Sequence, residues 1–245
     1  MKNVSELMSR LQKMMPAGTK PAFTTGEELL AWQKEQGEIR AAALARENRA
    51  MKMQRTFNRS GIRPLHQNCS FDNYHVENEG QMNALSKARQ YVDAFDGNIA
   101  SFIFSGLPGT GKNHLAAAIC NALLLRGKSV LIITVADIMS AMKDTFSNRE
   151  VSEEQLLNDL STVDLLVIDE IGVQTESRYE KVIINQIVDR RSSSKRPTGM
   201  LTNHSVAEMT KLLGERVMDR MRLGNSLWVN FTWESYRSRV TGKEY

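Results

Sequence analysis

A glycine-rich stretch at residues 106–113, Gly-Leu-Pro-Gly-Thr-Gly-Lys-Asn, has the residue types that bind phosphate groups. It follows an apolar run at 99–104 and precedes an apolar helical pattern at 114–125, which predicts the order strand, turn, helix. Glycine permits backbone angles at which successive N–H groups surround a phosphate at the positive end of a helix, and lysine adds a charge. We expect the phosphates to be held by Gly106, Pro108, Gly109, Thr110, Gly111, Lys112, Asn113 and His114.

Two adjacent carboxylates are the second candidate for chemistry. Asp169 and Glu170 follow the apolar run 165–168, so they end a buried strand. In an open α/β sheet such a strand ends at the same edge as a phosphate-binding loop. Asp169 can then hold Mg²⁺ through water, and Glu170 can polarise an attacking water as the general base. The alternative is an exposed acidic strand end beside an unrelated glycine turn.

One position departs from the usual phosphate-loop pattern. Asn113 stands where Ser or Thr normally offers its hydroxyl to Mg²⁺. An amide oxygen is a poorer ligand for this ion than an oriented hydroxyl. We therefore expect a weakened metal site formed by Asn113 and Asp169, and slow hydrolysis.

A polar side chain ends a further predicted strand. The apolar run 198–203 ends in Asn203, and we expect this strand to lie between the strand before the loop and the strand that carries Asp169. The amide would then reach the γ-phosphate and its attacking water. Alternatively, Asn203 satisfies backbone groups at a strand-to-loop turn.

Strands that alternate with helices position these residues. Strands are predicted at 99–104, 129–134, 164–170, 198–203 and 227–232, and helices at 80–95, 114–125, 137–146, after a cap at Ser152, and at 177–194. Alternation of this kind predicts an α/β fold with a five-stranded parallel sheet that is covered on both faces.

Length and composition fit one sizeable α/β domain plus an appendage. The 245 residues are 41% hydrophobic and 24% charged, as in ordinary globular proteins. No apolar run approaches the roughly 20 residues that span a bilayer, and the first residues have no signal-peptide core. We expect no membrane partner and a cytoplasmic location. Cys69 and Cys120 make no metal spacing with the four histidines, and we expect both to be reduced packing residues.

The N-terminal third is predicted to be helical and is basic. Residues 1–63 hold 12 Lys and Arg and 6 Asp and Glu, whereas the remainder of the chain is slightly acidic. We expect a short amphipathic helix at 3–15 and a long helix from 25 to about 57. The predicted domains are a small helical domain at 1–58, a linker at 59–75 and an ATPase domain at 76–245. The helices either pack as a stable hairpin or dock onto a partner protein.

Four segments together resemble the AAA+ ATPases of the IstB/DnaC branch. They are 106–112, Asp169 with Glu170, 201–203 and the segment Gly-Glu-Arg-Val-Met-Asp-Arg-Met at 214–221. The resemblance covers essentially the whole chain and implies ATP or ADP as ligand, with Mg²⁺. It also implies an adenine site lined by the segment 68–74, including Cys69 and Phe71. Unlike many AAA+ proteins, this chain is expected to lack a full C-terminal helical lid. Arg237 stands near the position of a second sensor.

The resemblance further implies self-association. Arg220 matches the arginine finger that reaches the γ-phosphate of a neighbouring subunit, where it supplies charge to the transition state. Arg216, one turn earlier, can share that role. The alternative for both residues is a solvated basic helix face. Under the resemblance, Lys112, Asp169, Glu170, Asn203 and Arg220 are the catalytic set.

Single-stranded DNA is the next partner that the resemblance implies. A cation beside an aromatic ring on which a base can stack is the chemistry that such a strand needs. Lys143 with Phe146 meets that requirement, and so does Arg178 with Tyr179, next to Ser177. Phe146 and Tyr179 are equally suited to packing in the core or at its rim.

The resemblance also implies a hexameric replicative helicase of the DnaB type as partner. Apolar residues of the N-terminal helices are the candidates for this contact, namely Leu7, Leu11, Leu29 and Trp32. The function implied is ATP-dependent loading of that helicase onto single-stranded DNA. The alternatives are a DNA-binding adaptor with a structural nucleotide and a transposition helper ATPase of the IstB type.

Overall fold

The computed structural model describes residues 26–57, 62, 64–95, 100–147, 152–173 and 177–236. The chain divides into two compact units, Met1–Leu44 and Ala45–Tyr245. The predicted helix at 3–15, with Leu7 and Leu11, lies outside the described residues, as does Arg237. The predicted division at residue 58 stays a prediction.

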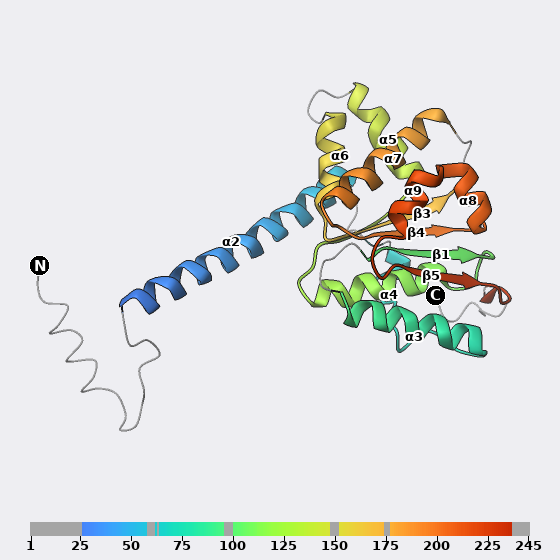
Figure 1. Ribbon diagram of the computed structural model, residues 1–245, viewed down its shortest axis with the longest axis horizontal. Helices are drawn as coiled ribbons and strands as arrows, with labels where there is room; N and C mark the ends of the chain where they lie inside the picture. The colour runs from blue at the N-terminus through green and yellow to red at the C-terminus, as the bar shows by residue number, and fades with distance from the viewer. Residues whose placement is uncertain are drawn as a thin grey trace, which may run out of the picture. The chain divides into compact units, whose positions relative to one another are not determined.

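Five parallel strands form one sheet in the order β2–β3–β4–β1–β5 (Figure 1). This confirms the predicted five-stranded parallel sheet. The strand before the loop is β1 and the strand with the two carboxylates is β3; β4 lies between them, as predicted. The strands are β1 Phe102–Gly106, β2 Val130–Thr134, β3 Leu165–Ile171, β4 Thr198–Thr202 and β5 Leu227–Phe231.

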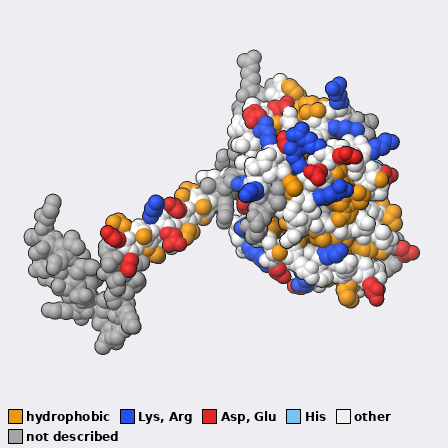
Figure 2. Space-filling view, viewed as in Figure 1, with side chains coloured by type: hydrophobic (Ala, Val, Ile, Leu, Met, Phe, Trp, Pro, Cys, Tyr) orange, Lys and Arg blue, Asp and Glu red, His pale blue; other side chains and the backbone are white. Residues whose placement is uncertain are grey.

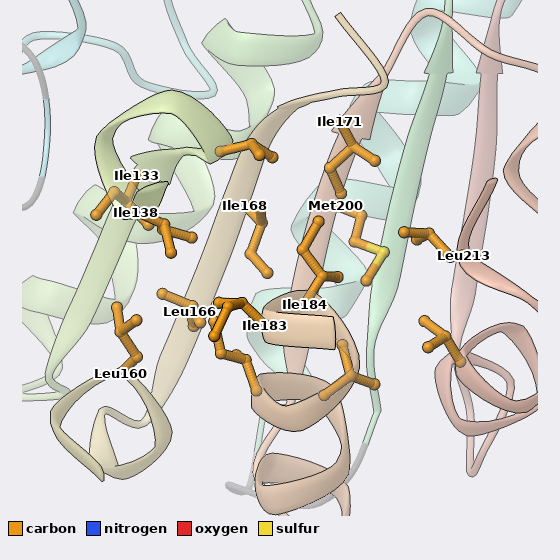
Figure 3. Packing of buried hydrophobic residues seen from close by; sticks show 14 of the residues in the cluster. Ile133, Ile138, Leu160, Leu166, Ile168, Ile171, Ile183, Ile184, Met200 and Leu213 are labelled. Carbon is orange, nitrogen blue, oxygen red and sulfur yellow. The ribbon is translucent and has the colours of Figure 1, made fainter. Parts of the chain in front are cut away.

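Alternating strand residues fill two cores, one on each face of the sheet. On β1, Ile103 faces one core, whereas Phe102 and Phe104 face the other. Helices α5 to α9 complete the first core (Figure 3), and α3 and α4 complete the second. The helices of the second unit are α3 Glu79–Asp93, α4 Lys112–Leu125, α5 Val135–Ser147, α6 Glu153–Thr162, α7 Arg178–Ser193, α8 Val206–Leu213 and α9 Glu215–Met221, with a 3₁₀ turn at Pro64–His66.

Helix α8 is missing from the sequence prediction. It is only 8 residues long, and one residue, Gly214, separates it from α9. Its N-terminus has a capping box in which the Ser205 side chain accepts from the Glu208 N–H and the Glu208 side chain accepts from the Ser205 N–H. That Ser-x-x-Glu spacing is the signal from which the helix is predictable.

Helix α2, Gly26–Phe57, has the extent predicted for the long N-terminal helix. Its stripe of apolar side chains in the first unit is exposed: Leu29, Trp32 and Ile39 keep 39%, 43% and 54% of their surface. Within the described part of the chain, no helix is both long and apolar enough to cross a membrane.

The most deeply buried charge in the described chain is Arg191, near the end of α7, with no exposed surface. Its guanidinium donates to the carbonyl oxygens of Leu160, Val163, Asp164 and Pro197 and to the hydroxyl of Thr198. Burial, with a further effect of Arg196, lowers the pKa of Arg191 to about 9, so the side chain is a cation at pH 7. Arg191 thereby joins the loops that lead into β3 and β4.

Replacement of Arg191 by Met should lower the free energy of unfolding by about 3 kcal/mol or more, because several buried acceptors lose their donor at once. Urea unfolding followed by circular dichroism measures this loss. Arg190→Met is the matched control, since Arg190 pairs with an exposed carboxylate, Glu154. Equal midpoints for the two variants would contradict the structural role of Arg191.

Candidate nucleotide-binding site

The glycine-rich loop joins β1 to α4, as predicted. Gly106, Gly109 and Gly111 have φ of 130°, 76° and 93°, a region that favours glycine. A Cβ on Gly106 would lie 2.1 Å from the backbone oxygen of Phe231 in β5. The Leu107 N–H donates to that oxygen at 3.1 Å. The loop therefore needs glycine where the neighbouring strand passes closest.

Lys112, the first residue of α4, is buried under the loop. Its ammonium donates to the carbonyl oxygens of Gly106 and Leu107, both at 2.7 Å. The Thr110 hydroxyl donates to the same Leu107 oxygen at 2.8 Å. The lysine charge is thus held at the centre of the loop, where a phosphate can draw it outward.

The segment after β5 braces the loop, which the sequence analysis missed. Trp233 donates its indole N–H to the Thr110 carbonyl oxygen at 2.8 Å, and the Tyr236 N–H donates to the Gly109 oxygen at 2.9 Å. Trp233 also packs on the second core. No local motif marks these residues, because each acts across more than a hundred positions of sequence.

Asn113 lies next to the carboxylate of β3. Its amide donates to Asp169 Oδ2 at 2.7 Å, while Asp169 Oδ1 accepts from the Glu170 N–H at 2.7 Å. The two predicted metal ligands are therefore brought together, with the amide as a donor to the carboxylate. Among the described residues, no three His, Cys, Asp or Glu side chains form a metal cluster. A site with one carboxylate suits Mg²⁺, which proteins bind through one or two carboxylates together with phosphates and water.

The backbone at Glu170 is strained. The register between β3 and β4 shifts between Ile168 and Ile171, so Asp169 and Glu170 form a bulge. Glu170 has φ of 60°, which is uncommon for a residue with a side chain and is typical of functional sites. The bulge re-aims this carboxylate at the strand's end.

The turn after β4 holds the backbone that follows Glu170. The Thr202 hydroxyl donates to the Ile171 oxygen at 2.9 Å, and His204 Nε2 lies 3.1 Å from the Gly172 oxygen. A Cβ on Gly172 would lie 2.3 Å from the His204 ring. Asn203 lies between these two anchors and is exposed. The structure thus places Asn203 beside the carboxylate strand, and its contact with a γ-phosphate stays a prediction.

The predicted adenine-site segment is fixed to α4. The Asn121 amide donates to the oxygens of His66, Gln67 and Cys69 at 2.8 to 3.2 Å. His114 Nε2 lies 3.0 Å from the Ser70 oxygen, and burial lowers the pKa of this imidazole despite that hydrogen bond. His114 is therefore neutral at pH 7 and positions the segment.

Cys69 and Phe71 both pack on the second core. The Cys69 side chain is buried, and burial raises the pKa of its thiol. Phe71 is partly buried, with the Arg89 guanidinium 5.4 Å above its ring. Their predicted contact with an adenine stays a prediction.

The DNA candidates lie on two helices. Lys143 and Phe146, near the end of α5, are exposed, and Phe146 keeps 72% of its surface. Ser177 caps α7 by accepting from the Glu180 N–H, and the Tyr179 hydroxyl donates to Glu153 at 3.0 Å. The exposed Phe146 is thus excluded from the core, which leaves it available for stacking.

The two arginines lie in a different cluster from the loop. Arg220 and Arg216, on α9, pair with Asp189 of α7. A role for Arg220 at the site of another copy of the chain is compatible with this position.

Replacement of Gly111 by Ala should weaken binding of a fluorescent ATP analogue at least about tenfold, because φ is 93° and the new Cβ would lie 2.8 Å from the Tyr74 ring. Gly127→Ala is the matched control: φ is 72°, but nothing lies within 4 Å. It should keep normal affinity and cost about 1–2 kcal/mol of stability. Equal affinities of the two variants would show that ATP binding does not require glycine at position 111.

The chain matches the family model of the IstB-like ATP binding protein over residues 9–243. It is 88% identical, over all 245 residues of both chains, to the "Replicative helicase loader DnaC" of Escherichia coli strain K12. It is 63% identical to the protein of the same name from Buchnera aphidicola subsp. Acyrthosiphon pisum, over 98% of each chain. A solved structure, "Crystal structure of the DnaC helicase loader", matches with a TM-score of 0.61 and 25% identity, covering 70% of this chain and all of that one. The chain therefore belongs to the family of IstB-like ATP-binding proteins, with an AAA+ ATPase fold.

Proposed function

We propose that the chain loads a hexameric replicative helicase of the DnaB type onto single-stranded DNA in the cytoplasm, with slow ATP hydrolysis as its switch. The observation that carries the proposal is the 88% identity, over the full length of both chains, to a protein named as a replicative helicase loader. The glycine-rich phosphate loop with Lys112 and the adjacent carboxylates support an ATP-dependent step.

Each part of the ATP site has a proposed role. Lys112 and the loop backbone bind the phosphates, and Asp169 holds Mg²⁺ through water. When bound, Mg²⁺ supplies charge that offsets the phosphates. Glu170, aimed by the bulge, accepts a proton from the attacking water, and Asn203 orients that water. Arg220 of a neighbouring copy completes the charge around the γ-phosphate.

Slow turnover follows from the residue at position 113. The Asn113 amide donates to Asp169 in place of the hydroxyl that is usual at this position. When a metal is bound, the Asn113 amide must either break its hydrogen bond to Asp169 Oδ2 or share that oxygen with the metal. We infer that this weakens the metal site, which suits a timed switch between an assembled state and a released state.

Replacement of Glu170 by Gln should reduce phosphate release at least about 100-fold, because an amide cannot accept the proton. Binding of a fluorescent ATP analogue should change less than about twofold, since Gln keeps the shape of Glu. Glu79→Gln, exposed in the first turn of α3, is the control for loss of one negative charge. Full helicase loading by Glu170→Gln would favour the adaptor alternative, in which nucleotide is structural.

Replacement of Trp32 by Ala should weaken binding of the full-length chain to the helicase about tenfold, since buried aromatic anchors carry much of the energy of interfaces. Biolayer interferometry with immobilised hexameric helicase measures this. Leu30→Ala is the matched control, because Leu30 is 66% exposed and lies about 100° around α2 from Leu29. Unchanged binding by Trp32→Ala would remove the stripe of Leu29 and Trp32 from the helicase contact.

A further inference from the structure

One face of α7 carries polar side chains over its whole length. Arg178, Lys181, Asn185 and Asp189 recur every three or four residues, so they share one side of the helix. The opposite side, with Ile183, Ile184, Ile187 and Val188, is buried. The polar face is therefore held in a fixed orientation by the core beneath it.

Helix α9 faces this polar side with two arginines. Arg216 and Arg220 are four residues apart and share one face of the helix, while Val217, Met218 and Met221 anchor α9 in the core. Figure 2 shows Lys and Arg side chains gathered over α7 and α9, with acidic side chains among them. The backbone that carries both arginines is thus set by packing, and only their long side chains need a further constraint.

A groove of about 330 Å³ runs between the two helices. Its charged lining consists of four cations and one carboxylate, namely Arg178, Lys181, Arg216, Arg220 and Asp189. Like charges at this spacing repel one another, and Asp189 is the anion among them. The groove as a whole is suited to an anionic group such as the phosphates of a nucleotide.

Asp189 contacts both arginines through one oxygen. Its Oδ1 forms an ion pair with Arg220 Nη2 and lies 3.7 Å from Arg216 Nη2. The Arg220 side chain is 20% exposed to solvent, whereas the Arg216 side chain is 74% exposed. Asp189 therefore fixes Arg220 at the wall of the groove and holds Arg216 more loosely.

We propose that Asp189 is a positioning residue for Arg220, which completes the ATP site of a neighbouring copy of the chain. The inference rests on the proposed role of Arg220 in trans. A guanidinium has five N–H donors, so one bond to Asp189 leaves further donors to engage a phosphate in the groove. Preorganised donors stabilise a transition state without rearrangement, and a flexible arginine amid three other cations loses that advantage.

The opposite arrangement is a latch, in which Asp189 withholds Arg220 until a neighbour arrives. The geometry favours positioning, because the groove stays open beside the ion pair and a phosphate can enter while the pair persists. The two arrangements predict opposite effects on the rate of ATP turnover when the Asp189 carboxylate is removed. Loss of the carboxylate slows turnover if Asp189 positions Arg220, and it speeds turnover if Asp189 is a latch.

The first test compares phosphate release by full-length Asp189→Asn with that of the unchanged chain, with single-stranded DNA present. We expect a five- to tenfold loss, with affinity for a fluorescent ATP analogue unchanged. Asp189→Glu, which keeps the charge, should recover part of the rate. Asp219→Asn, exposed on α9 and absent from the groove lining, should keep the full rate. Unchanged or faster release by Asp189→Asn would overturn the proposal.

The second test mixes two impaired variants. Lys112→Ala has a disabled loop and an intact Arg220, whereas Asp189→Asn has an intact loop and a misplaced Arg220. Some sites in mixed assemblies then combine the intact loop of an Asp189→Asn chain with the correctly placed Arg220 of a Lys112→Ala chain. Phosphate release by the mixture should therefore exceed the sum of the separate rates at least threefold. A merely structural defect in Asp189→Asn would not recover on mixing, and that outcome would overturn the inference.

Arg220→Ala separates this inference from the proposed function. If Arg220→Ala keeps the normal rate, the trans role of Arg220 fails, and the inference fails with it. If Arg220→Ala is slow while Asp189→Asn is normal, only the inference fails. In the Arg220→Ala background, Asp189→Asn should have no further effect, because the residue it positions is gone.

Discussion

The register shift between β3 and β4 is the constraint on which the candidate site depends. Asp169 and Glu170 occupy the space that one residue would fill in a regular ladder, and Glu170 adopts a left-handed backbone conformation as a result. Such a conformation costs on the order of 1–3 kcal/mol and persists only where the surroundings enforce it. The hydroxyl of Thr202 and the ring of His204 supply that enforcement at the next two peptide groups.

The same turn also carries Asn203, which links two predicted functions through one short piece of backbone. A movement of the turn after β4 would displace the Asn203 side chain and the end of β3, with its two carboxylates, together. Because β4 lies between β1 and β3, the loop, the carboxylates and the turn share one edge of the sheet. The order of the strands therefore brings these three segments together, and the side chains at the strand ends supply the chemistry.

The sequence predicted those parts of the site that are encoded locally. The loop from Gly106 to Lys112 and the pair Asp169 and Glu170 each consist of adjacent residues whose types show their chemistry, and alternation of apolar segments predicted the sheet. Other contacts join residues that are far apart in sequence. Asn113 and Asp169 were expected at one metal site, but the hydrogen bond from the amide to the carboxylate, across 56 positions, leaves no local pattern. Trp233 meets Thr110 across 123 positions, again without a local pattern. The pairing of Asp189 with Arg220 likewise depends on how α9 packs on α7.

The brace from the segment after β5 has a consequence for the loop's peptide planes. In a trans peptide the carbonyl and the following N–H point in opposite directions, and the described chain has no cis bonds. When Tyr236 and Trp233 bind the oxygens of Gly109 and Thr110, they turn the N–H groups of Thr110 and Gly111 the other way. The N–H dipoles that attract an anion are thus oriented when the chain folds. The loop therefore needs little rearrangement, and spends little free energy on it, when a phosphate binds.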